Sequence, residues 1–366
     1  MSYRGAAGTE RSPDLVSRPR AAHFPNRFNP AVEPLGALIE RRRELLEGLD
    51  QHPEWAEMEA ELADLLKARL DSDGLQLLRL DQRTPTYVLD QIVKYETVHR
   101  VRHSRDLERR LAEDRRCYAF FHPALPNEPL IFTEVALTDD MSSNVGSLLD
   151  PESPVVEPAT CSCAIFYSIN SCHEGLRGVP LGNALIGQVT NQLAIAFPGL
   201  DTFATLSPVP GFRSWLTHLA RFNPGTATNA IAAATLRSLE RSDWYADTET
   251  SAELKRRLVP LCAYYLLRVK RGDAAADPVA RFHLRNGARL DRINWLSDVS
   301  PDGLNRSAGL MANYVYRCNK PRREYDASTN VCTVQASRQV KLLAAHAASL
   351  IDRDLRNPER PQKLTA

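Results

Sequence analysis

The sequence predicts an α+β protein, a mixed sheet with flanking helices that follows a small all-helical domain. Three observations predict this class. Helical periodicity dominates the early part of the chain, strand-like apolar runs begin near Val98, and two glycines introduce a long apolar-periodic segment in the middle. We expect a disordered lead at 1–30, a helical domain at 31–97, an α+β domain at 98–350 and a flexible tail at 351–366.

The expected helical domain contains three segments with apolar residues at helical spacing. Leucines form one stripe in LGALIERRRELLEGLD (35–50), and tryptophan, methionine and leucines do so in PEWAEMEAELADLLKARL (53–70). TPTYVLDQIVKYE (84–96) begins with a threonine cap and reads as a third helix. Such a region is more often a packing surface than a catalytic one, so we expect any homo-oligomer to form through it.

Four apolar runs predict the strands of one sheet. They lie near Cys117–Phe121, Ile131–Leu137, Cys161–Ile169 and Thr202–Thr205. The first two are separated by ALPNE, which is typical of a hairpin loop. The helix that begins after Gly182 should pack against this sheet, and further long helices should follow Ser207.

Composition excludes several classes of function. The 46 basic residues nearly balance the 45 acidic ones, so overall charge gives no support for binding nucleic acid or a membrane surface. The seven cysteines are too sparse for a disulfide scaffold and lack zinc-finger spacing, which favours thiols in a reducing compartment and no metal site. Because the first 30 residues contain no apolar secretory core, we expect a cytoplasmic protein.

The segment RGVPLGN joins a buried strand to the long helix and predicts an anion-binding turn. Free backbone N–H groups and the helix dipole favour a pyrophosphate there, and Gly178 and Gly182 would let a ligand approach the backbone. An ordinary strand-to-helix turn is the alternative, since neither a Walker loop nor a dinucleotide fingerprint is present. The candidate ligand-binding residues are Arg177, Gly178, Val179, Pro180, Leu181, Gly182 and Asn183.

Ser207 stands between prolines in TLSPVPGF (205–212), at the end of a strand and before a sharp bend. His283 lies in a helix-like segment that Asn286 and Gly287 close. A turn serine and a structural histidine are the alternatives to catalytic roles for these two residues. The segment 292–316 is rich in amide, hydroxyl and aromatic groups, which indicates either a pocket wall or a hydrogen-bonded core.

The motifs together resemble the malonyl-CoA decarboxylase family. They occur in the family's order from about Met58 to Leu350, as RRCYAFFHP, EPLIFTEVALTDDMSSN, AIFYSIN, GLRGVPLG, LSPVPGF, PVARFHLRNGA, RINWLSDVS and GLMANYVY. The resemblance implies an acetyltransferase-like (GNAT-like, acyl-CoA N-acyltransferase-type) catalytic domain, in agreement with the order of hairpin, strand, glycine turn, long helix and strand.

The resemblance also assigns roles. It implies that Ser207 is the proton acceptor, that His283 is the proton donor, that 177–183 binds coenzyme A and that Tyr316 belongs to the site wall. The implied substrate is malonyl-CoA or a close malonyl thioester, and malonyl-CoA would be decarboxylated to acetyl-CoA and CO2 through a thioester enolate. Coenzyme A is then part of the substrate, and no metal, biotin or nucleotide cofactor is required.

The sequence departs from the family at three points. The helical part is about half as long as expected, Pro180 stands where some members carry glutamate, and Arg306 stands where others carry glycine. A cation at position 306 could contact the substrate carboxylate or narrow the pocket. The alternatives are a CoA-dependent acyltransferase of the same fold, which needs an acceptor-amine site, and a non-catalytic CoA-binding homologue.

Overall fold

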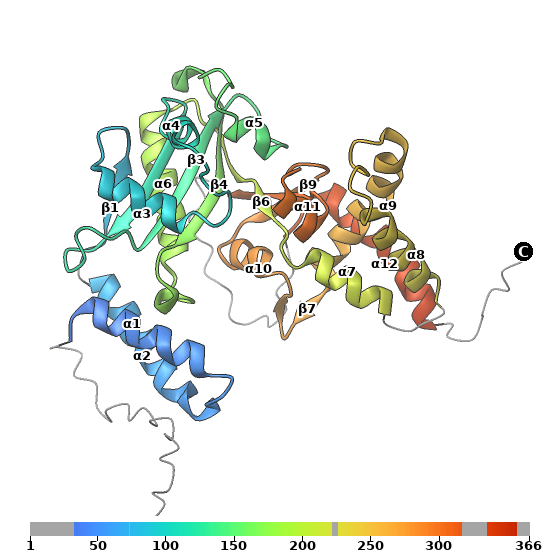
Figure 1. Cartoon of the computed structure of the whole chain (residues 1–366), viewed down its shortest axis with the longest axis horizontal. Coiled ribbons are helices and arrows are strands. Elements are labelled where there is room, and N and C mark those ends of the chain that lie inside the picture. The colour runs from blue at the N-terminus through green and yellow to red at the C-terminus, as the bar shows by residue number, and fades with distance from the viewer. Residues whose placement is uncertain (1–32, 73, 222–225, 317–334, 357–366) are drawn as a thin grey trace, which may run out of the picture.

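The structure is a computed structural model that describes residues 33–72, 74–221, 226–316 and 335–356 (Figure 1). The expected disordered lead at 1–30 lies outside the described residues. The last helix, α12 (Arg338–Arg356), includes residues 351–356, so the first part of the expected flexible tail is helical. The remainder of that tail lies outside the described residues.

One eight-stranded sheet organises the chain. Its order is β1-β2-β3-β4-β5-β10-β6, and β9 pairs with β10. Neighbours are antiparallel except β4 and β5, which run parallel. The predicted strands are confirmed as members of one sheet. The bounds are β1 Gln76–Leu80, β2 Arg115–Phe121, β3 Ile131–Thr138, β4 Cys163–Ser171, β5 Thr202–Thr205, β6 Ser207–Pro208, β9 Arg289–Asn294 and β10 Met311–Tyr316.

Helices cover both faces of the first half of the sheet. Leu38 of α1 and Leu185 of α6 share a buried cluster with Phe120 of β2, whereas Val88 of α3 packs with Ala119 on the opposite face. Adjacent strand residues point to opposite faces, so β2 alone supplies side chains to both layers. These helices are α1 Leu35–Gly48, α2 Ala56–Ser72, α3 Thr86–Tyr95, α4 Ser104–Arg110, α5 Val145–Leu149 and α6 Leu181–Ala196.

The expected boundary between a helical domain and the sheet domain, at 97/98, is wrong. β1 pairs along its whole length with β2, and α3 packs on the sheet, so both belong to the α+β domain. β1 escaped notice because it is an edge strand with mostly exposed or half-buried residues, and its sequence QLLRL does not alternate. In the described part of the chain, the helical module that precedes β1 consists of α1 and α2 with the short 3₁₀ turn Pro53–Trp55 between them.

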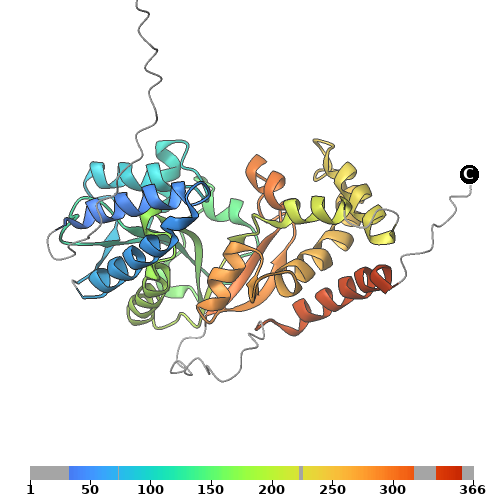
Figure 2. The ribbon, with the colours of Figure 1, turned by 90° about the horizontal axis from the view of Figure 1, so that it is seen from below.

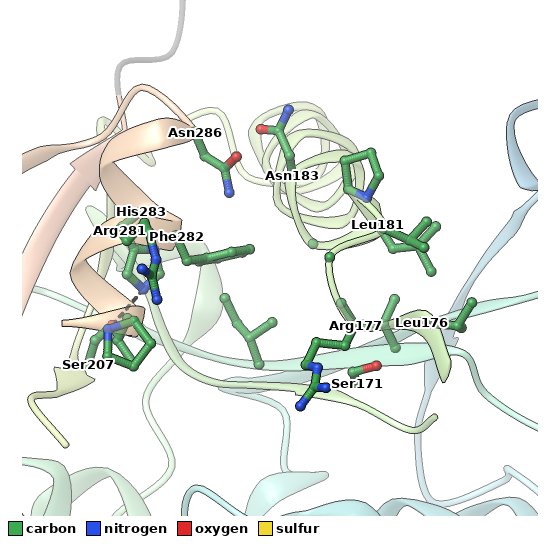
Figure 3. Close-up of a pocket in the computed structure, with 18 of the residues that line it drawn as sticks. Ser171, Leu176, Arg177, Leu181, Asn183, Ser207, Arg281, Phe282, His283 and Asn286 are labelled. Carbon is green, nitrogen blue, oxygen red and sulfur yellow. Dashed lines mark hydrogen bonds between the residues drawn. The ribbon is translucent and has the colours of Figure 1, made fainter. Parts of the chain in front are cut away.

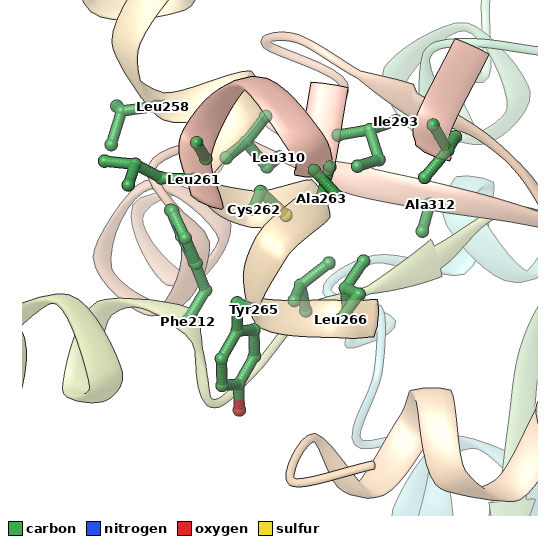
Figure 4. Close-up of a cluster of buried hydrophobic side chains, with 14 of the residues drawn as sticks. Phe212, Leu258, Leu261, Cys262, Ala263, Tyr265, Leu266, Ile293, Leu310 and Ala312 are labelled. Carbon is green, nitrogen blue, oxygen red and sulfur yellow. The ribbon is translucent and has the colours of Figure 1, made fainter. Parts of the chain in front are cut away.

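The second half of the chain forms a helical body beside β9 and β10, drawn in yellow to red in Figures 1 and 2. Phe212, Cys262 and Leu266 pack at its centre with Leu310 and Ala312 of the β10 region (Figure 4). This core supports the base of the strands that carry the site. Its elements are α7 Phe212–Arg221, α8 Ala227–Leu239, α9 Thr248–Arg268, the ribbon of β7 Lys270–Arg271 and β8 Ala274–Ala275, α10 Pro278–Arg285, α11 Pro301–Ser307 and α12.

Candidate active site

Strands β4 and β5 separate and leave an opening in the sheet. β5 pairs with β4 only as far as Phe166, whose carbonyl accepts the last bond from Leu206 N at 3.0 Å. β4 continues to Ser171 without β5 beside it, because the chain turns away at Ser207–Pro208 to pair with β10. The backbone edge of β4 after Phe166 is therefore available to a ligand.

A cavity of about 770 Å³ occupies this opening. Its walls come from β4, from the segment between the 3₁₀ turn η3 (Glu174–Leu176) and α6, and from α10, as Figure 3 shows. All the predicted site residues except Tyr316 line this cavity. They are Ser207, His283 and the seven residues 177–183. Two regions predicted separately from sequence thus face one space.

Ser207 and His283 are joined by a hydrogen bond inside the cavity. Ser207 Oγ lies 3.0 Å from His283 Nε2, drawn as a dashed line in Figure 3. Ser207 is 6% exposed and His283 is 3% exposed, so both are almost inaccessible to solvent. One comes from a two-residue strand and the other from α10, 76 positions further along the chain.

Tyr316 lies behind the histidine. Its hydroxyl is 2.9 Å from His283 Nδ1, and the imidazole also stacks on Tyr314 with ring centroids 4.6 Å apart. Burial lowers the pKa of His283 to about 3, so the ring is neutral at pH 7. A neutral imidazole carries one N–H, and with Tyr316 donating to Nδ1 it is Nε2–H that faces Ser207.

Thr205 completes the chain of hydrogen bonds. The Ser207 hydroxyl donates to Thr205 Oγ1 at 2.8 Å, and Thr205 Oγ1 also accepts the backbone N–H of Tyr314 at 3.3 Å. Thr205 is fully buried. Sequence reasoning missed this residue, although side chains two positions apart on an extended segment share a face, and the spacing Thr-x-Ser carries that signal.

Asp277 ties together the two segments that carry Ser207 and His283. Its Oδ1 accepts from the backbone N–H groups of Val279 and Ala280, which caps α10, and its Oδ2 accepts from Gly211 N at 3.2 Å, just after Ser207. The Asp-Pro pair that begins α10 is a helix-start signal that could have identified it. Gly211 is required here because a Cβ would lie 2.2 Å from the Tyr265 hydroxyl.

The predicted anion-binding turn has the features of an open helix start. α6 begins at Leu181, its N-cap Pro180 provides no side-chain bond, and its first turn carries no acidic residue. Gly178 has φ +84°, a conformation that favours glycine. Gly182 also lines the cavity, and its role in ligand approach stays a prediction; a Cβ there would lie 2.7 Å from the Phe282 ring, so the missing side chain also admits α10.

Three arginines line the cavity without a described acidic partner. Arg177 precedes the turn, and Arg281 and Arg285 lie four residues apart on α10. None forms an ion pair with another described residue. Unpaired cations beside an uncapped helix N-terminus favour an anionic ligand.

One further expectation does not hold, and one pair of alternatives is decided. Arg306 lies on α11, half-exposed beside Asp302 and away from the cavity, so it neither contacts nor narrows the site. The polar segment 292–316 forms a hydrogen-bonded core instead of a pocket wall: Asn313 Nδ2 donates to Thr205 O at 2.8 Å, and Asn294 Nδ2 donates to Asn313 Oδ1 at 2.7 Å. This core holds the end of β5.

The described residues contain no cluster of three or more His, Cys, Asp or Glu side chains that could hold a metal ion. In the same part of the chain, no helix combines the length and apolar character needed to cross a bilayer.

Comparisons with known proteins identify the family of this chain. The family profile described as malonyl-CoA decarboxylase C-terminal domain matches residues 74–353, a range that begins just before β1. Among curated proteins, malonyl-CoA decarboxylase, mitochondrial, from Anser anser anser is 38% identical over 83% of this chain, and its namesake from Rattus norvegicus is 36% identical over 85%. The chain spans 65% and 68% of these two relatives' lengths.

Solved structures give the same result. The crystal structure of malonyl-CoA decarboxylase from Rhodopseudomonas palustris matches 84% of this chain and 75% of its own, with 40% identity and a TM-score of 0.77. That from Agrobacterium vitis matches 85% and 76%, with 38% identity and a TM-score of 0.78. By sequence, fold and the residues brought together in the cavity, this chain belongs to the malonyl-CoA decarboxylase family.

Proposed function

We propose that this protein decarboxylates malonyl-CoA to acetyl-CoA and CO2, with Ser207 and His283 as its catalytic residues. The observation that carries the proposal is the buried chain of hydrogen bonds from Tyr316 through His283 to Ser207, which lines the cavity. The N-terminus of α6, which has no side-chain cap, lines the same cavity. The substrate is inferred from similar proteins that are named malonyl-CoA decarboxylase. The hydrogen-bonded residues in the cavity suggest how it would be decarboxylated.

The proposed position of coenzyme A is supported by charge and by the shape of the cavity. Its pyrophosphate lies at the turn 177–183, where the first backbone N–H groups of α6 are uncapped. The three cavity arginines supply further positive charge for its phosphates. The pantetheine arm runs along the free edge of β4, which places the malonyl thioester beside Ser207.

The chemistry needs placement and a proton. Loss of CO2 leaves a thioester enolate, which a hydrogen bond from Ser207 stabilises in a poorly solvated site. Ser207 then passes its proton to the α-carbon and recovers one from His283 Nε2, while Tyr316 supplies Nδ1. The reaction consumes one proton overall, and Tyr316 takes it from solvent to restore the relay. Because His283 is neutral, it acts as a member of this relay and not as a stored imidazolium.

No resident cofactor belongs to the proposal, since the thioester carbonyl itself accepts the electrons of the breaking bond. The described cysteines Cys117, Cys161, Cys163, Cys172 and Cys262 are free thiols, which supports a reducing compartment, and we propose the cytoplasm. Self-association through α1 and α2 stays a prediction that sedimentation of the whole chain would test.

The decisive experiment is incubation with malonyl-CoA in deuterated buffer. Acetyl-CoA and CO2 should form in equal amounts, and the new methyl group should carry deuterium because its proton comes from exchangeable groups. Formation of CO2 without label in the methyl group would exclude the relay. Binding of malonyl-CoA without any product would favour the non-catalytic homologue.

A further inference from the structure

Arg42 of α1 reaches out of the N-terminal module to the segment that precedes the phosphate-binding turn. Its Nη1 donates to the carbonyl oxygen of Gly175 at 2.6 Å, and its Nη2 donates to that of Arg177 at 2.7 Å. Arg42 is only 4% exposed. A guanidinium buried to this extent and bonded to two carbonyls holds their relative positions more firmly than a surface contact would.

The charge of Arg42 is balanced from within the module. Glu59 of α2 accepts from Arg42 Nε at 3.0 Å and from Nη2 at 2.7 Å. The guanidinium is therefore carried by α1, oriented by Glu59 of α2, and bonded to the carbonyl groups of Gly175 and Arg177. All three parts must be in place for the arrangement to form.

The contact between α1 and the turn segment is unusually close. A Cβ on Gly175 would lie 1.9 Å from the carbonyl oxygen of Ile39, so only glycine permits α1 to approach. The carbonyl of Arg177, which Arg42 holds, immediately precedes Gly178 with its φ of +84°. A shift of Arg177 would thus change the direction in which the chain enters α6.

We propose that Arg42 is a positioning residue for substrate binding, through which the N-terminal helices hold the phosphate-binding turn in its binding conformation. The inference rests on the proposed function, because it takes 177–183 to be the site of the coenzyme A phosphates. Arg42 lies outside the cavity lining and does not touch the reacting groups. Its loss should therefore weaken binding and leave the chemical step intact.

The test compares Arg42→Met with Arg43→Met in the full chain. Arg43 is the matched control, since it stands next in α1 and, among the described residues, forms ion pairs only with Glu40 and Glu47 of the same helix. We expect Arg42→Met to raise the calorimetric Kd for coenzyme A and the KM for malonyl-CoA by about ten-fold, as misplacement of binding groups does. Its kcat should stay near wild type, and Arg43→Met should change neither constant.

Arg42→Lys covers the case in which the methionine variant does not fold. Lysine retains the charge facing Glu59, but one ammonium group cannot reproduce the planar fork that reaches both carbonyls. Folded Arg42→Lys must show the same weakening of coenzyme A binding. Wild-type Kd and KM in a folded Arg42 variant would overturn the inference, as would a loss confined to kcat. Failure of the wild-type protein itself to bind coenzyme A would instead refute the proposed function.

Discussion

Ser207 and His283 share one hydrogen bond, so their contributions to turnover should not add. Ser207→Ala and His283→Asn should each lower kcat by about two to four powers of ten, the range for a lost general acid or oxyanion donor. Affinity for coenzyme A should remain, because neither residue belongs to the phosphate-binding turn. Steady-state kinetics and calorimetry measure both quantities.

The double variant is the control on this interpretation. It should be little worse than the worse single variant, since removing either partner already breaks the relay. Full additivity of the two losses would show that the residues act separately. Wild-type turnover by His283→Asn would remove the histidine as proton donor.

Thr205 holds the Ser207 hydroxyl while the cavity is empty. Thr205→Val removes that acceptor and leaves the backbone N–H of Tyr314 without its partner. We expect kcat to fall about ten-fold, roughly the worth of one hydrogen bond, with KM little changed. Thr205→Ser keeps the hydroxyl and should restore most of the rate, and failure of this rescue would show that the threonine methyl group matters instead.

At the scale of the element, the start of α6 has two properties that one substitution can separate. Asn183 lies in the first helical turn and faces the cavity (Figure 3). Asn183→Asp should stabilise the helix, because a negative charge suits its N-terminus, yet it should repel the phosphates of coenzyme A. We expect an unchanged or higher melting temperature together with a Kd for coenzyme A raised about ten-fold by charge repulsion.

Gln188→Glu is the matched control, since it makes the same isosteric change on the exposed middle of α6. It should leave binding at the wild-type level. Equal affinities in Asn183→Asp and Gln188→Glu would move the phosphate site away from this turn. Gly182→Asp is a poorer test, because any side chain there collides with Phe282 whether or not a phosphate binds nearby.

At the scale of the whole molecule, burial of two histidines should make the fold sensitive to acid. Burial lowers the pKa of His99 to about 4 and that of His283 to about 3, while an unfolded histidine has a pKa near 6.5. Below pH 6.5 these two histidines therefore bind protons in the unfolded chain but stay unprotonated in the folded chain. Unfolding becomes easier as pH falls, until the folded-state values are reached.

Urea unfolding at pH 7 and pH 5 checks the contribution of His283. When the pH falls from 7 to 5, the protonation of His283 in the unfolded chain should lower the free energy of unfolding of the wild-type protein by about 2 kcal/mol. His283→Asn should lack this part of the loss. His346→Asn, a substitution of an exposed histidine on α12, should behave as wild type does. An identical pH dependence in wild type and His283→Asn would show that folding does not lower the pKa of the ring.

The sequence by itself determined β2 to β5, the long helices and, through its motifs, the candidate reacting groups. Strong periodicity and the Pro-x-Pro-Gly turn are local signals, so β2 to β5 and the strand end at Ser207 could be predicted from neighbouring residues. The motifs also implied that Ser207 and His283 share a site, and the structure places them 3.0 Å apart.

Only the tertiary structure decided which groups support that pair and the turn at 177–183. Thr205, Asp277 and Arg42 act through contacts with residues distant in sequence or through a shared strand face, and a single sequence does not display such contacts. β1 was hidden because an edge strand buries too little to impose a pattern. Gly182 shows the same limit in reverse: glycine signals a close approach, but whether a phosphate or a phenyl ring approaches depends on how α6 and α10 pack.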